Sequence, residues 1–258
     1  INILSNHIGA RVVVVDMGVV GGLEPHLGLI CEMIDFGTQD ISKGPAMSQR
    51  QALDSVEAGI RVVEAEIAKG LDIVGTGDMG IGNTTPSAAI CATITGRPVV
   101  QVTGRGTGLG DAQLVQKVQI IEKALEINKP DPQNALEVLA KVGGFEIGGL
   151  AGVMLEAAAN RVPVVIDGFI SGAAALIASG ICPMAKDYFI AAHQSVEIGH
   201  KVMLDYMGLE PLLNLNMRLG EGTGGALAIS LAEASAKILD EMLTFAEADV
   251  SGATEEAK

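Results

Sequence analysis

The apolar positions of the chain follow two spacings, one typical of strands and one typical of helices. Residues 12–15, closed by Asp16, form a run of valines of the kind found in strands buried on both faces of a parallel sheet. Between residues 48 and 69 the apolar positions recur every three or four residues, and Gly70 follows where a helix is expected to end. The pattern predicts a buried strand and then an amphipathic helix.

This alternation continues to the end of the chain. Further strands are predicted at residues 71–74, 99–102, 164–166 and 188–192. Helical spacing follows in the segments that begin near Asn83, Leu114, Ser171, Val196 and Gly224. Because parallel strands need crossover connections, the order predicts an α/β fold with a doubly wound, mostly parallel, Rossmann-like sheet. We expect residues 1–222 to form one large α/β nucleotide-binding domain and residues 223–258 to form a C-terminal helix.

Composition narrows the possible partners. The 258 residues carry a formal net charge of -14, which argues against binding to nucleic acid or an anionic membrane, since both need clustered Lys and Arg. The segment 168–185 carries no charge, but its Gly, Ser and Pro residues favour a buried helix over a membrane span. The three cysteines lie far apart and outside any C-x-x-C pattern, which indicates a reducing, cytoplasmic compartment without disulfides. These properties fit a soluble protein that acts on small molecules.

Glycine-rich segments fall at the predicted carboxyl ends of the strands. They occupy residues 75–85, 103–110, 167–172 and 219–225. Ligands bind in this place in doubly wound sheets. Glycines let a ligand approach the backbone, and the free amides at a helix N-terminus bind a phosphate without a basic side chain. The sequence therefore predicts one crevice that holds a phosphate.

Two other kinds of nucleotide chemistry fit the sequence less well. The segment 75–80, GTGDMG, matches the glycine pattern of dinucleotide-binding proteins, but Asp78 would lie inside the phosphate turn. The next predicted strand ends in Gln101 and Thr103 instead of an acid for a ribose diol. Enzymes that use a diphosphate-activated ribose carry two adjacent acids, whereas VVIDGFISG offers only Asp167. Pyrophosphate and Mg²⁺ are therefore not expected, and the four histidines have no metal-binding spacing.

Glu221 is the leading catalytic candidate. It stands between Gly220 and Gly222, in a loop where a purely structural role for a carboxylate is hard to name. A carboxylate in a mostly apolar cleft suits a general base that removes a proton from a weakly acidic N–H. The alternative is an acid that stabilises the N-terminus of the following helix.

Six segments, in this order, closely resemble one enzyme family: GDMGIGNTTPSAA, TGRGTGL, GGFEIGGLAG, VIDGFISGAAAL, HQSVEIGH and RLGEGTGGA. The family is that of the nicotinate-nucleotide:5,6-dimethylbenzimidazole phosphoribosyltransferases, and the resemblance spans essentially the whole chain. It implies transfer of phosphoribose from nicotinate mononucleotide to an aromatic base, with inversion of the glycosidic linkage, in cobamide assembly. It also implies a homodimer, with a heterodimer as the alternative, and neither metal nor cofactor.

The resemblance assigns roles to particular residues. Glu221 would be the general base, and Met79 and Leu219 would line the slot for the aromatic ring. Asp78 and Lys117 would lie near the ribose and nicotinate, although Lys117 by itself would be interpreted as a solvated helix lysine. The phosphate and ribose contacts would come from Gly80, Gly106, Asp167, Gly168 and Ser195.

The sequence departs from the family pattern in two places. Asp78 stands where family members often have Glu, which shortens its reach by one methylene. The chain is also expected to begin at the family's first strand, so that the upstream part of a small helical subdomain, shared with residues 223–258, is not visible. Two alternatives follow: an enzyme for phenolic or purine bases that works with a partner, and a nucleotide-binding subunit without catalytic activity.

Overall fold

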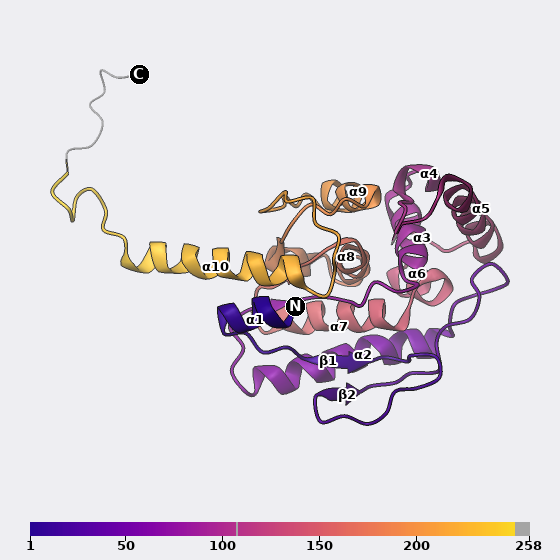
Figure 1. Cartoon of the computed structure of the whole chain (residues 1–258), viewed down its shortest axis with the longest axis horizontal. Helices are drawn as coiled ribbons and strands as arrows, with labels where there is room; N and C mark the ends of the chain where they lie inside the picture. The colour runs from indigo at the N-terminus through magenta and orange to yellow at the C-terminus, as the bar shows by residue number, and fades with distance from the viewer. Residues whose placement is uncertain (107, 251–258) are drawn as a thin grey trace, which may run out of the picture.

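The computed structural model describes residues 1–106 and 108–250 and confirms an α/β fold with parallel strands (Figure 1). The strands are β1 (Val14–Asp16), β2 (Leu29–Cys31), β3 (Val74–Gly75), β4 (Val164–Ile166) and β5 (Phe189–Ala191). In the described residues they form two sheets, a β1-β2 pair and a three-stranded sheet in the order β3-β4-β5. In the larger sheet Val164 lies opposite both Val74 and Phe189, so β4 is the central strand.

Helices make up most of the described chain. They are α1 (Asn2–Ile8), α2 (Gln49–Ile67), α3 (Thr84–Thr95), α4 (Val99–Val102), α5 (Asp111–Asn128), α6 (Ala135–Val142), α7 (Phe145–Ala159), α8 (Phe169–Ile181), the 3₁₀ helix η1 (Pro183–Tyr188), α9 (Ile198–Met207) and α10 (Thr223–Glu241). Figure 1 shows α7 between α2 and α8, and both pairs of helices are in contact.

The predicted helix at 48–69 is confirmed as α2, and its ends have clear causes. Ser48 and Gln51 form a reciprocal capping box, in which each side chain bonds to the backbone amide of the other residue. At the other end Gly70 has a φ of 86°, the left-handed conformation that glycine adopts without strain.

The contact between α2 and α7 is made by backbone atoms. A Cβ added to Gly59 would lie 1.8 Å from the carbonyl oxygen of Gly149, and one added to Gly152 would lie 2.0 Å from that of Val56. Real Cβ atoms do not approach so closely. The two helices can pack at this distance only because glycine stands at positions 59 and 152.

The core surrounds β4 and α8. All three residues of β4 are buried, and so are the first ten residues of α8, from 169 to 178. This confirms the buried helix predicted within 168–185, since a helix that is apolar on every side belongs in an interior. Within residues 1–106 and 108–250, no helix has the length and apolarity needed to cross a membrane.

Three predictions about the first half of the chain need correction. Residues 99–102 form helix α4 instead of a strand: Val99 and Val102 are buried three positions apart, whereas Val100 between them is 61% exposed. That spacing is helical, and Pro98 directly precedes the helix.

The predicted first strand also differs from the structure. The valine run is not buried on both faces, because β1 pairs with β2 alone and Val14 is exposed. Helix α1 precedes this strand, so the chain does not begin at a strand.

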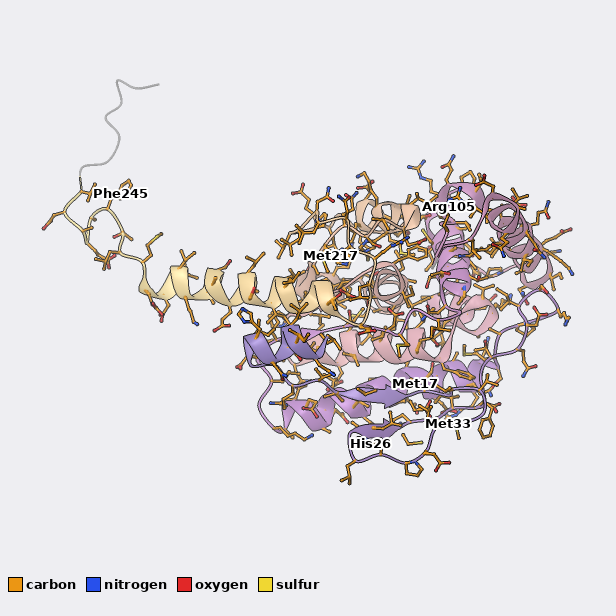
Figure 2. All side chains as sticks on the ribbon, viewed as in Figure 1. Met17, His26, Met33, Arg105, Met217 and Phe245 are labelled. Carbon is orange, nitrogen blue, oxygen red and sulfur yellow. The ribbon has the colours of Figure 1, made fainter. Side chains whose placement is uncertain are left out.

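The last helix extends away from the body of the molecule. Its first residues pack against α1, and Figure 2 shows Phe245 well beyond its far end. The start of α10 at Thr223 coincides with the predicted boundary between residues 1–222 and 223–258. A small helical subdomain at this end stays a prediction, and residues 251–258 of it lie outside the described chain.

Candidate active site

The glycine-rich segments meet beyond the carboxyl ends of β3 and β4, and the segment 103–110 joins them through Gly106, where an added Cβ would lie 3.2 Å from Oγ1 of Thr84. A Cβ added to Gly77 would lie 2.4 Å from the backbone nitrogen of Gly222, so the segments 75–85 and 219–225 touch along their backbones. Asp167, which directly follows β4, accepts hydrogen bonds from the second of these segments. The sequence prediction that these loops converge is therefore confirmed.

Glu221 adopts a backbone conformation that is rare for its residue type. Its φ is 59°, and the flanking Gly220 and Gly222 have φ values of 77° and 72°. A left-handed residue other than glycine costs free energy and persists only where its surroundings impose it, which is common at functional sites. The side chain is 38% exposed, and its Oε2 lies 3.5 Å from the nitrogen of Ile1.

The two residues predicted to bind the aromatic ring lie beside Glu221. Gly220 is in contact with the backbone of Asp78, so Leu219 and Met79 belong to the two loops that meet there. Both side chains are exposed, Met79 by 71% and Leu219 by 65%. They offer an open apolar surface beside Glu221, where a mostly apolar cleft was expected.

Asp78 belongs to a chain of polar groups that the sequence analysis did not find. Its Oδ2 accepts a hydrogen bond from Nδ2 of Asn83 at 3.1 Å. Burial raises the pKa of the Asp78 carboxyl against the lowering effect of Asn83 and of the Gly80 amide. Burial also raises the pKa of Glu146, which interacts with Asn83 as well. Glu146 stands in the GGFEIGGLAG segment, and an acid two positions after a pair of glycines was the signal available in the sequence.

Lys117 is a buried residue, so the interpretation as a solvated helix lysine is wrong. Its Nζ donates to Oγ1 of Thr84 at 2.8 Å and to the carbonyl oxygen of Gly104 at 3.3 Å. Burial lowers the pKa of Lys117, and the charge of Glu197 opposes that shift. A Cβ on Gly106 would lie 3.9 Å from this Nζ, so the amine adjoins the segment 103–110. Thr107 of that segment lies outside the described residues.

The remaining predicted phosphate residues lie at the ends of β4 and β5. Gly168 is the N-cap of α8, and no side chain caps this end of the helix. The amide of Ser195 donates to Nδ1 of His200 at 3.0 Å, and burial lowers the pKa of His200 to about 3. His193 and His200 are both buried. The contacts predicted for Gly80, Gly106, Asp167, Gly168 and Ser195 with a ligand stay predictions.

Several buried polar atoms near these loops have no hydrogen-bond partner, which is uncommon in proteins. Within the described chain they are Asn83 Oδ1, Ser87 Oγ, Ser171 Oγ, His193 Nδ1, Glu197 Oε2 and His200 Nε2. Glu197 was not predicted, although it stands in the HQSVEIGH segment. Its carboxylate lies against Gly104, where an added Cβ would be 1.9 Å from Oε2. In residues 1–106 and 108–250, no three His, Cys, Asp or Glu side chains are grouped as metal ligands.

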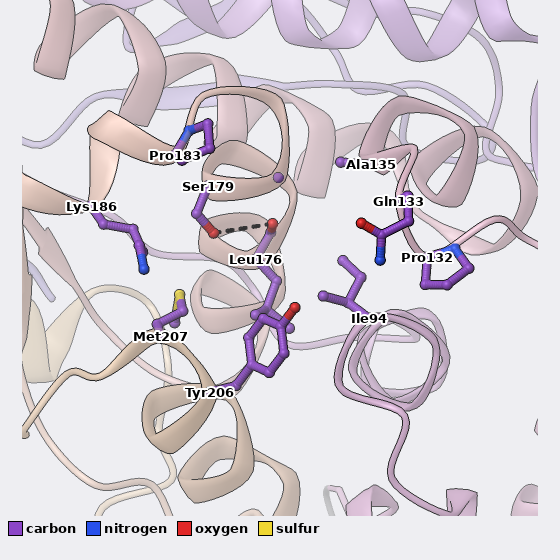
Figure 3. A pocket seen from close by; sticks show the side chains of 11 residues that line it. Ile94, Pro132, Gln133, Ala135, Leu176, Ser179, Pro183, Lys186, Tyr206 and Met207 are labelled. Carbon is purple, nitrogen blue, oxygen red and sulfur yellow. Dashed lines mark hydrogen bonds between the residues drawn. The ribbon is translucent and has the colours of Figure 1, made fainter.

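A separate cavity of about 260 Å³ lies at the C-terminal ends of α3 and α8, whereas the glycine-rich loops lie at their N-terminal ends. It is lined by the last turns of α3, α8 and α9, by the segment 132–135 at the start of α6, and by Pro183 and Lys186 of η1 (Figure 3). None of the predicted site residues lines it. We therefore place the candidate site at the glycine-rich loops, where the predicted residues gather.

Comparison with known proteins identifies the family. A family model described as Phosphoribosyltransferase matches residues 1–250. A protein of Roseiflexus sp. (strain RS-1), named nicotinate-nucleotide–dimethylbenzimidazole phosphoribosyltransferase, is 60% identical over 255 residues, which cover 99% of this chain and 72% of that protein. The chain belongs to this phosphoribosyltransferase family.

Other members of the phosphoribosyltransferase family agree with this. A protein of the same name from Desulforudis audaxviator (strain MP104C) is 58% identical over 98% of this chain and 72% of its own length. The crystal structure of CobT from Thermus thermophilus has a TM-score of 0.93 and 42% identity, and covers 98% of this chain and 75% of that one. The fold and the family expected from the six sequence segments are both confirmed.

Proposed function

We propose that the protein transfers phosphoribose from nicotinate mononucleotide to 5,6-dimethylbenzimidazole, giving α-ribazole 5′-phosphate and nicotinate for cobalamin assembly. The observation that carries the proposal is the strained Glu221, held between two glycines where the loops after β3 and β4 meet. The names of the relatives at 60% and 58% identity specify this reaction.

The chemistry follows from the groups at the site. Glu221 takes the proton from the N–H of the acceptor, and the nitrogen lone pair attacks the anomeric carbon of the ribose. The bond from that carbon to nicotinate breaks, and its electron pair neutralises the positively charged pyridine nitrogen. Attack from the face opposite nicotinate converts the β linkage to α. Because the leaving group is already cationic, positioning and a base account for the reaction without a cofactor.

The substrates would occupy the two sides of Glu221. Met79 and Leu219 offer apolar surface for the flat acceptor ring. Lys117, which the resemblance placed near the ribose and nicotinate, adjoins Gly106, one of the predicted phosphate residues, so we assign it to the phosphate instead. The uncapped start of α8 at Gly168 supplies free amides for the same group. Asp78 adjoins the Glu221 loop from the nucleotide side. Since the apolar surface is open, a related acceptor such as a purine or a phenol is the second candidate.

Two further properties belong to the proposal. The family resemblance supports a homodimer, which size-exclusion chromatography with light scattering would test. The separated cysteines and the absence of a membrane-spanning helix in the described chain support a cytoplasmic enzyme. Fractionation of the source cells would test this placement.

Incubation of the purified chain with both substrates tests the proposed reaction. Nicotinate release and the anomeric configuration of the product are followed by NMR, with and without added Mg²⁺. We expect an α-riboside phosphate at the same rate in both cases. Product with a phenol or purine alone would favour the second candidate. Binding of the nucleotide without turnover of any acceptor would favour a non-catalytic subunit.

A further inference from the structure

Both carboxylate oxygens of Asp167 accept hydrogen bonds from backbone amides of the protein. The side chain is buried, with 1% of the residue exposed. Oδ2 accepts from the amide of Gly222 at 3.1 Å, and Oδ1 accepts from the amide of Gly225 at 3.0 Å. One of these amides directly follows Glu221, and the other lies in the first turn of α10. Asp167 thereby links the end of β4 to the loop that carries Glu221.

This linkage has a clear electrostatic basis. The first amides of a helix have no partner within the helix, and a negative charge near them is favourable. Burial raises the pKa of Asp167, whereas the amides of Gly225 and Gly222 and the neighbouring His193 favour its charged form. The N-terminus of α10 is therefore occupied by the protein's own carboxylate, and its bonded amides are not free for a substrate phosphate.

The loop also fits closely around this carboxylate. A Cβ added to Gly224 would lie 2.1 Å from Cδ2 of His193 and 2.8 Å from Oδ1 of Asp167. His193 Nε2 itself lies 3.7 Å from the same oxygen. Because position 224 is wedged between these two side chains, Asp167 and the loop pack as one unit. A shift of the carboxylate would move the backbone that directly follows Glu221.

We propose that Asp167 is a positioning residue that holds the carboxylate of Glu221 where it can take the acceptor's proton. The role rests on the proposed function, and it replaces direct contact with the ribose. The amide of Glu221 itself is held by a backbone oxygen, and Thr223 within the loop bonds to the carbonyl oxygen of Gly220, so Asp167 is the side chain from outside the loop through which we expect the placement of the base to be altered. A residue that acts in this way affects the rate through Glu221 alone.

A double-mutant cycle tests this dependence. Asp167→Asn keeps the size of the side chain but replaces one acceptor oxygen by an amide group that faces a backbone donor. We expect kcat to fall about 10- to 100-fold, with the KM and the dissociation constant for nicotinate mononucleotide changing less than about twofold. Added to Glu221→Gln, the same substitution should cost less than about threefold more. Asp205→Asn, which removes an exposed carboxylate on α9, is the control and leaves kcat unchanged.

Other outcomes would overturn the inference. If Asp167 bound the ribose directly, Asp167→Asn would weaken nucleotide binding at least about tenfold. Its effect on the rate would then multiply with the effect of Glu221→Gln. If the parent enzyme turns over no acceptor, the proposed function fails, whereas weakened nucleotide binding by Asp167→Asn in an active enzyme defeats only the positioning role.

A measurement on the parent protein covers the case in which Asp167→Asn does not fold. Hydrogen exchange of the Gly222 and Gly225 amides is followed by NMR with and without saturating nicotinate mononucleotide. If Asp167 stays on these amides, their protection persists or increases in the complex. If the carboxylate turns to the ribose, the protection of both amides falls on binding, and the proposal is wrong.

Discussion

The backbone amide of Glu221 donates a hydrogen bond to the carbonyl oxygen of Asp78 at 2.9 Å. The two acids that the sequence singled out are therefore joined through their main chains, although their loops lie far apart in the sequence. Because the bond involves no side chain, the shorter Asp at position 78 leaves the placement of the Glu221 loop unaltered. We expect Glu221 to favour catalysis through its side chain and to reduce folding stability through its left-handed backbone, and the two effects can be measured separately.

Glu221→Gly should stabilise the protein while it removes the proposed base. Glycine relieves the left-handed backbone at a φ of 59°, which we expect to add about 1 kcal/mol to the free energy of unfolding. The melting temperature should rise by about 2–4 °C, whereas kcat falls about 10²- to 10⁴-fold. Calorimetry and nicotinate release measure the two effects.

Lys129→Gly is the matched control for that substitution. Lys129 ends α5, is exposed and also has a positive φ, of 45°. The same gain in stability is expected there with no change in kcat. A melting temperature lowered by Glu221→Gly would show that the Glu221 side chain holds the loop in place, against the strain argument.

Lys117→Met should weaken binding of the substrate phosphate. We expect the dissociation constant for nicotinate mononucleotide to rise about 10-fold or more, since a charge-assisted contact is lost, and that for the riboside without phosphate to stay the same. Lys123→Met, on the exposed side of the same helix, is the control. Equal losses for nucleotide and riboside in calorimetric titrations would exclude a phosphate contact.

The buried Lys117 also gives a pH dependence of stability. Its pKa is lowered from the usual 10.5 in the folded protein, so the folded state binds fewer protons than the unfolded state between the two values. Burying the charged amine costs free energy at neutral pH, and the cost is relieved as pH rises toward 10.5. The free energy of unfolding of Lys117→Met relative to the parent should therefore decrease as pH rises toward 10.5 in urea titrations.

His200 should make the fold sensitive to acid. Its folded pKa of about 3 lies below the usual 6.5, so the neutral ring contributes stability that is complete above pH 6.5 and is lost as pH falls toward 3. The loss approaches about 1.4 kcal/mol per pH unit. The difference in unfolding free energy between the parent and His200→Gln should therefore shrink by about 2 kcal/mol from about pH 6.5 to pH 5.

Gly152→Ala tests the contact between α2 and α7. Its added Cβ would lie 2.0 Å from the carbonyl oxygen of Val56, and we expect a loss of about 3 kcal/mol despite the better helix propensity of alanine. Gly44→Ala places its Cβ in open space and should be nearly neutral. Denaturant midpoints compare the two variants. Similar midpoints would mean that the helices can separate without cost.

The elements that the sequence predicted well are those with local causes. Helix α2 follows from the spacing of its apolar residues, the capping box at Ser48 and the glycine at position 70. Residues 99–102 were misassigned because a β-branched run resembles a strand, although burial of the first and last positions is helical. At these residues the packing of Val99 and Val102 against the rest of the fold outweighs the strand propensity of valine.

The glycine-rich loops and Glu221 were predicted from the residues themselves, whereas the roles of the other site residues came from the family resemblance. The contacts within the site were not visible in the sequence. The bonds of Asp167 to Gly222 and Gly225 span 55 and 58 positions, and no local pattern encodes such a pairing. The link from Asn83 to Asp78 and Glu146 was also missed. Lys117 shows the same limit, because its place on a helix with many polar residues gave no sign that it points inward.

The glycines between α2 and α7 restrict how related sequences can diverge. At positions 59 and 152 the opposing atoms are carbonyl groups, which every amino acid carries. A larger residue at either glycine therefore cannot be compensated by a smaller partner, as often happens between side chains in a core. A homologue that retains this helix crossing must retain both glycines, whereas residues on the outer faces of the two helices can be substituted.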